Sequence, residues 1–248
     1  MAWSNAVALG LASPDLAAAE VVGTDPPHRV VGLGDVPVTM PVLLAMVRRS
    51  GRASARLALP VPGDPVGLPA ADPVLAAAVD AGEVAVLPDL SSAVPASGAC
   101  GLVPTVDETG VLWTAYRTSA FTPTNGATSL GEADQGLAQS LREATSVLDR
   151  LDAASWTDQD ADDVAALRSG RLDGDGLAPG YPDRAVAVLV RARRLRSIVR
   201  LASRDEGGTL TAPAAAARVA ALAPLDRAAR HAEMAAYNAV ADAGQAPG

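Results

Sequence analysis

The spacing of apolar residues changes character about halfway along the chain. Up to residue 120, stretches that alternate apolar and polar residues are interspersed with stretches of helical spacing. Strands are expected at His28–Leu33, Ala53–Leu59 and Glu83–Leu87, and helices at Asn5–Ala12, Ser13–Glu20, Val38–Arg49 and Pro73–Ala81. Gly101–Val106 and Val111–Arg117 predict a hairpin, because Asp107–Gly110 is a turn-forming sequence. Together these segments predict a small mixed sheet with flanking helices.

After residue 128 the strand signals stop. Ser119–Thr128 is polar and rich in turn formers, so we expect an exposed connection there that proteases cut first. Helices are expected at 130–152, 158–168, 182–204, 211–222 and 224–243, with a proline at or near the start of each of the last two. The sequence thus predicts an α+β protein, with a mixed-sheet domain at 1–120 and a helical domain of about five helices at 129–248.

The helix expected over Pro182–Arg204 has the most unusual pattern in the chain. One stripe is apolar and includes Leu195, which we expect in the core, and the opposite flank carries Val190 and Ile198. A helix that is apolar on two sides packs against neighbours on both, so both flanks should be buried.

A narrow stripe of basic residues runs beside the apolar one. It consists of Arg193, Arg196, Arg200 and Arg204. We expect these arginines to form ion pairs with acids of neighbouring helices or of a second subunit, with Asp134 and Asp152 as candidate partners. Since four clustered cations repel one another unless water screens them, the pairs are expected to be exposed.

Composition narrows the possible functions. All 20 basic residues are arginine and the net charge is −8, which disfavours general nucleic-acid binding. The alanine and arginine bias suggests a high-GC bacterial genome. Cys100 is the only cysteine, so no intrachain disulfide forms, and a cytoplasmic location fits. We expect no membrane span, because the uncharged run Leu90–Val106 carries Pro, Gly and Ser, and no secretory signal, because the apolar start lacks basic residues.

No catalytic, cofactor or metal site is recognised. Gly32 and Gly34 begin a dinucleotide-binding pattern, but Pro37 stands where the third glycine belongs. Without lysine there is no Walker A loop. The two histidines, His28 and His231, have no metal-ligand spacing. The clustered aspartates at 158–163 and 173–175 are interpreted as a helix start and a solvated turn.

The aromatic residues offer one candidate interaction surface. Trp113, Tyr116 and Phe121 lie close together with Arg117 between them, and such residues are common at binding hot spots. On a strand, Trp113 and Tyr116 face opposite sides, so one can enter the core while the other is exposed. Packing in the core is the competing interpretation.

The favoured hypothesis is a non-enzymatic interaction or regulatory protein that binds itself as a homodimer or binds another protein. The alternative is a small-molecule-binding protein or enzyme with its site between the two domains. A weaker third hypothesis is nucleic-acid binding through the arginine stripe. The sequence alone does not discriminate among these three hypotheses.

Overall fold

The computed structural model describes residues 1–51, 54–66, 68–69, 72–90, 98–119, 128–150, 177–203 and 212–243. The chain forms two compact units. The N-terminal unit comprises residues 1–127, 176–182 and 237–248, and the helical unit comprises residues 128–175 and 183–236. The connection expected at 119–128 lies almost wholly outside the described residues.

The N-terminal unit is built on a mixed sheet of six strands, so the α+β class is confirmed. The strands are β1 (His28–Val31), β2 (Val38–Thr39), β3 (Arg56–Ala58), β4 (Val84–Pro88), β5 (Gly98–Asp107) and β6 (Gly110–Ser119). Their order is β2-β1-β6-β5-β4-β3, and β1 and β6 are parallel while the other neighbours are antiparallel. Sequence patterns anticipated each strand except the short β2.

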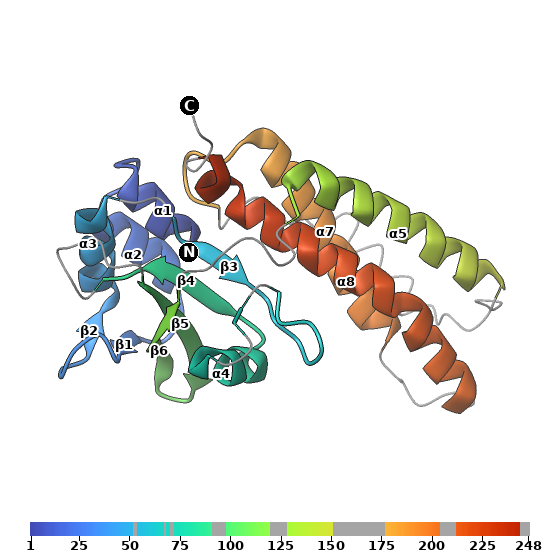
Figure 1. The fold of residues 1–248 in the computed structure, drawn as a ribbon, viewed down its shortest axis with the longest axis horizontal. Coiled ribbons are helices and arrows are strands. Elements are labelled where there is room, and N and C mark those ends of the chain that lie inside the picture. The colour runs from blue at the N-terminus through green and yellow to red at the C-terminus, as the bar shows by residue number, and fades with distance from the viewer. Residues whose placement is uncertain are drawn as a thin grey trace. The chain divides into compact units, whose positions relative to one another are not determined.

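Helices cover both faces of this sheet (Figure 1). The helices α1 (Ala2–Ala8), α2 (Pro14–Val22) and α3 (Met40–Ser50) bury one face, where Leu44 shares a core with Leu102 of β5. The helix α4 (Pro73–Ala81) lies on the other face, where Val74 packs closely over Gly101. Leu102 and Gly101 are neighbours on β5 and so point to opposite faces.

Side chains next to the helix ends cap several helices of this unit. The Ser13 hydroxyl accepts a hydrogen bond from the Leu16 N–H (3.2 Å) and the Asp72 carboxylate accepts one from the Val74 N–H (3.1 Å). The first helix differs from expectation, because α1 spans residues 2–8 and not 5–12. It ends because Gly10 turns the chain at a φ of 75°.

The β5–β6 hairpin is closed by the turn that the sequence predicts. Asp107 Oδ1 accepts hydrogen bonds from the Thr109 hydroxyl (2.6 Å), the Thr109 N–H (2.6 Å) and the Gly110 N–H (3.1 Å). These donors, above all the Thr109 hydroxyl, lower the pKa of Asp107. Each strand extends beyond the expected hairpin, to Gly98 and Ser119.

Two asparagine side chains form hydrogen bonds with the backbone N–H and C=O groups along the outer edge of β3, the last strand of the sheet. The Asn5 amide donates to the Ala55 carbonyl and accepts from the Ala55 N–H, both at 2.9 Å. Asn238 does the same for Leu57, at 3.0 and 2.8 Å. Ala55 and Leu57 present their backbone groups on the same side of the strand, away from β4. The asparagines therefore replace the hydrogen bonds of a missing neighbouring strand.

The helical unit contains three helices in the part of the chain that the structure describes. They are α5 (Leu130–Arg150), α7 (Asp183–Ala202) and α8 (Ala212–Ala243), whose final residues from Tyr237 belong to the N-terminal unit. The helix expected at 158–168 lies outside the described residues, so a bundle of about five helices is not established.

The expected break before Pro224 is wrong, because α8 runs through it as one helix. Proline removes one hydrogen bond to the carbonyl four residues earlier. Here both Pro224 and Ala220 are exposed, so water can reach that carbonyl. Leu222, Leu225 and Ala229 are buried on either side of the proline, and this continuous apolar stripe holds the helix together.

Candidate functional site: an arginine cluster and a pocket in the helical unit

The arginine stripe of α7 meets the acids of α8. Arg193 Nε lies 3.2 Å from Glu233 Oε1, and Arg196 Nη1 lies 2.5 Å from Glu233 Oε2. Arg196 Nε is also 3.8 Å from Asp226 Oδ1. One carboxylate thus bridges two guanidinium groups, so pairing of the stripe with acids of a neighbouring helix is confirmed for these two arginines.

Two details of the predicted pairing are wrong. Asp134 pairs with Arg191 and Arg184 and not with Arg196, because it lies near the start of α5 beside the first half of α7. The Arg196–Glu233 pair is also not exposed, since only 22% of the Arg196 side chain and 11% of the Glu233 side chain are accessible. Sharing of one carboxylate offsets the repulsion between the arginines. Asp152 and Arg204 lie outside the residues whose side chains are described.

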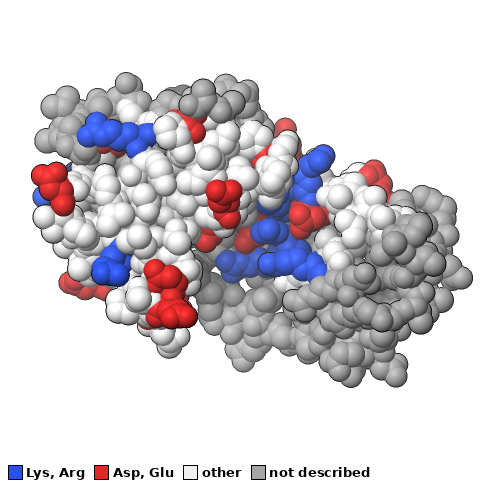
Figure 2. All heavy atoms as spheres, turned by 90° about the horizontal axis from the view of Figure 1, so that it is seen from below, with Lys and Arg blue, Asp and Glu red and all other residues white. Residues whose placement is uncertain are grey.

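The apolar faces of α7 are less deeply buried than expected. Ala192 and Val199 are in the core, whereas Leu195, Val190 and Ile198 are only half-buried. Arg200 is exposed, and its Nε donates to the Arg196 carbonyl (3.3 Å). Figure 2 shows arginine and acidic side chains interleaved on the face drawn there, so the arginines do not form an unbroken positive field.

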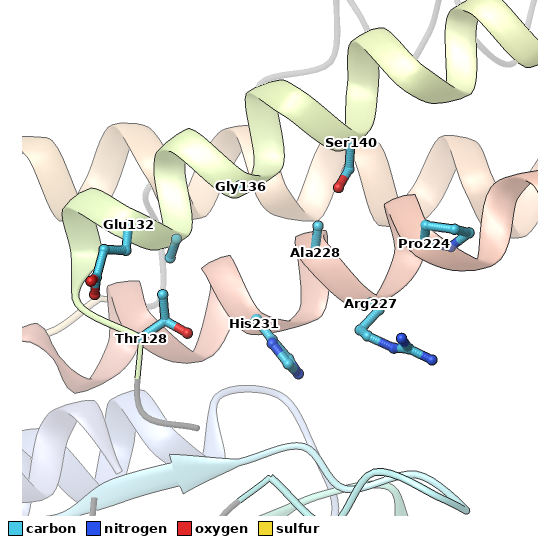
Figure 3. Close-up of a pocket in the computed structure, with 9 residues that line it drawn as sticks. Thr128, Glu132, Gly136, Ser140, Pro224, Arg227, Ala228 and His231 are labelled. Carbon is cyan, nitrogen blue, oxygen red and sulfur yellow. The ribbon is translucent and has the colours of Figure 1, made fainter. Parts of the chain in front are cut away.

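A pocket of about 310 Å³ lies between α5 and α8 (Figure 3). Its lining combines small residues with polar ones: Thr128, Glu132, Ala133, Gly136, Ser140, Pro224, Arg227, Ala228 and His231. Ser140 and Ala228 point toward each other across the gap between the helices. Arg227 and His231, four residues apart, extend from the same side of α8. An arginine, a histidine and hydroxyl-bearing side chains thus border a floor of small residues.

Glu132 at one end of the pocket is held by the first turn of α5. Its Oε2 accepts hydrogen bonds from the Ser129 hydroxyl (2.7 Å) and the Ser129 N–H (2.9 Å), and the Ser129 hydroxyl accepts one from the Glu132 N–H (3.3 Å). This is a reciprocal capping box, and its Ser-x-x-Glu spacing is visible in the sequence at Ser129 and Glu132. The Ser129 donors, the hydroxyl first, lower the pKa of Glu132.

The capping box should make stability depend on pH. A carboxyl whose pKa is lowered by folding stabilises the protein above its unfolded-state pKa of about 4.3, and this contribution disappears as pH falls through the folded-state value. Glutamine at position 132 cannot titrate. We therefore expect the stability difference between wild type and Glu132→Gln to narrow from neutral to acidic pH in urea unfolding. A difference that stays constant with pH would contradict this.

The aromatic candidates lie in the N-terminal unit. Trp113 is half-buried and packs against the core between the sheet and α1–α3, and its indole N–H donates to His28 Nδ1 at 3.4 Å. Tyr116 is half-buried on the opposite face of β6, and Arg117 is exposed. Phe121 lies outside the described residues. Trp113 and Tyr116 thus lie on opposite faces of β6 as expected, but both are half-buried, so neither the buried nor the exposed position that the sequence allows is reached.

Reactive and metal-binding groups are scarce in the described part of the chain. Burial raises the pKa of the Cys100 thiol to about 12, with a further contribution from Asp89, so the thiol is protonated at neutral pH. Within the described ranges, no three His, Cys, Asp or Glu side chains come together as a metal site. Nor does any helix there have the length and apolarity needed to cross a membrane.

Sequence reasoning missed the pocket. The sequence shows only that His231 has no metal-ligand spacing, and it assigns no role to Arg227. The available signal was the four-residue spacing of Arg227 and His231 on a single helix. This spacing holds whether or not the helix breaks at Pro224. The residues of α5 that face Arg227 and His231, however, depend on how the two helices pack, which the sequence does not show.

The fold and the pocket define an α+β protein with a sheet-based unit and a helical unit. Residues 1–127 match the N-terminal domain of the Rv1486c-like protein family, and residues 131–234 match its C-terminal domain. The chain therefore belongs to the Rv1486c-like family. No curated protein and no solved structure matches it.

Proposed function

We propose that the protein is a non-enzymatic interaction or regulatory protein of the bacterial cytoplasm that pairs with a second copy of itself. The observation that supports this is a set of leucines close together in the sequence, two between α1 and α2 and one in the first turn of α2. Leu9, Leu11 and Leu16 are 52%, 50% and 49% exposed. Large apolar side chains exposed close together are typical of interaction surfaces.

A second copy suits this segment because it carries little charge. Between Leu9 and Leu16 the only charged residue is Asp15. In a two-fold dimer each surface meets its own copy, so a strongly charged segment would oppose itself, whereas an apolar one does not. The leucine group, defined as Leu9, Leu11 and Leu16, is therefore the proposed contact between copies.

Sedimentation equilibrium tests the proposal. Wild type should fit a monomer–dimer equilibrium, and Leu11→Glu should weaken dimerisation by about tenfold or more, since tenfold corresponds to about 1.4 kcal/mol. Val36→Glu is the matched control, because Val36 is 73% exposed in the same unit but lies outside the leucine group. A single-chain mass for wild type at every concentration would refute self-association, and equal weakening by both substitutions would refute the leucine contact.

A further inference from the structure

The floor of the α5–α8 pocket contains a glycine that packing does not explain. Gly136 lies inside a 21-residue helix, where glycine costs about 1 kcal/mol relative to alanine. A Cβ at this position would meet no heavy atom within 4 Å. No neighbouring helix approaches too closely for a side chain there. What the glycine provides is open space in the pocket.

The cation that borders this space, the exposed Arg227, has no counter-ion in the part of the chain that the structure describes. Among the described residues, the Arg227 guanidinium makes no hydrogen bond or ion pair. The acid that lines the same pocket, Glu132, is held by Ser129 through the capping box. An oxyanion from outside the chain would therefore find the Arg227 guanidinium without a competing acid among the described residues.

We propose that the α5–α8 pocket binds a small organic anion, with its carboxylate or phosphate group on Arg227 and its apolar body over Gly136. Guanidinium groups bind both oxyanions through two parallel hydrogen bonds. Ala133 and Ala228, which also line the pocket, give the body an apolar surface. The volume of about 310 Å³ lies at the lower end of the range for small-molecule sites. This binding function is independent of self-association.

Calorimetric titration with octanoate, octyl phosphate and the neutral 1-octanol tests this proposal, each used below the concentration at which it aggregates. At least one anion should bind the wild-type protein, and 1-octanol should bind about tenfold more weakly or not at all. The stronger of the two anions identifies the preferred head group. No binding of either anion, or equal binding of the alcohol, would overturn the proposal.

Three variants locate the site. Gly136→Leu should abolish anion binding by filling the pocket, and because leucine favours helix more than glycine does, its thermal unfolding should show a protein at least as stable as wild type. Arg227→Gln should weaken binding by about tenfold or more. Arg142→Gln, an exposed arginine of α5 that bonds Gln139, should bind like wild type. Unchanged binding in Gly136→Leu or Arg227→Gln, or equal loss in Arg142→Gln, would overturn the assignment of the site.

Discussion

Replacing Glu233 by glutamine is expected to lower the free energy of unfolding by about 3–5 kcal/mol, the usual cost of removing one member of a buried ion pair. The Glu233 carboxylate bonds both Arg193 and Arg196, and only 11% of its side chain is accessible. Glutamine preserves the size but not the charge, so two guanidinium groups lose the acid that they share. Urea unfolding followed by circular dichroism measures the change.

Glu143→Gln is the matched control for this experiment. Glu143 is an exposed glutamate of α5 whose carboxylate accepts a hydrogen bond from Gln139. Exposed substitutions of this kind usually change stability by less than about 0.5 kcal/mol. If the two variants lose the same stability, water screens the arginine cluster fully and the burial of the Arg196–Glu233 pair does not strengthen it.

Replacing Asn5 by leucine should produce the second large effect. Leucine has a similar size but can neither donate to nor accept from Ala55, whose N–H and C=O would both be left unpaired in a buried site. Each unsatisfied buried group costs about 1–3 kcal/mol. The midpoint of urea unfolding should fall accordingly, and the measurement is the same as for Glu233.

Asn238→Leu provides the comparison because it makes the same change at the other end of the β3 edge. The hydrogen bonds of Asn238 to Leu57 are only partly buried, so water can replace them in the variant. We therefore expect a smaller loss for Asn238→Leu than for Asn5→Leu. The opposite order would show that burial does not determine the strength of these contacts.

Signals that act within a few residues could be predicted from the sequence. Asp107 closes the hairpin turn as expected, and Ser13, Asp72 and Ser129 cap helices at positions where serine and aspartate are typical caps. Each signal depends on a side chain and a backbone group three or fewer residues apart. Their geometry is set locally, so it does not require knowledge of the fold.

Contacts between distant residues could not be predicted. Asn5 and Ala55 are 50 residues apart, and Asn238 and Leu57 are 181 apart. A single amide that bonds an edge strand leaves no periodic pattern. The choice of Glu233 over Asp134 as the partner of Arg196 depends equally on which helices pack together. The pocket arises from the same packing, and so its residues on α5 and α8 were not connected in advance.

The Asn238 contact has a consequence for how the protein is made. The β3 strand leaves the ribosome 181 residues before the asparagine that completes its edge. At the usual rate of synthesis this interval lasts roughly 10–40 s. Throughout it, a nascent chain carries a strand with an open backbone edge at Leu57, which is the kind of surface that pairs with other nascent chains. If β3 folds before Asn238 is synthesised, its open edge can therefore pair with other chains. Late addition of β3 to the sheet, or a chaperone that covers the edge, would prevent this.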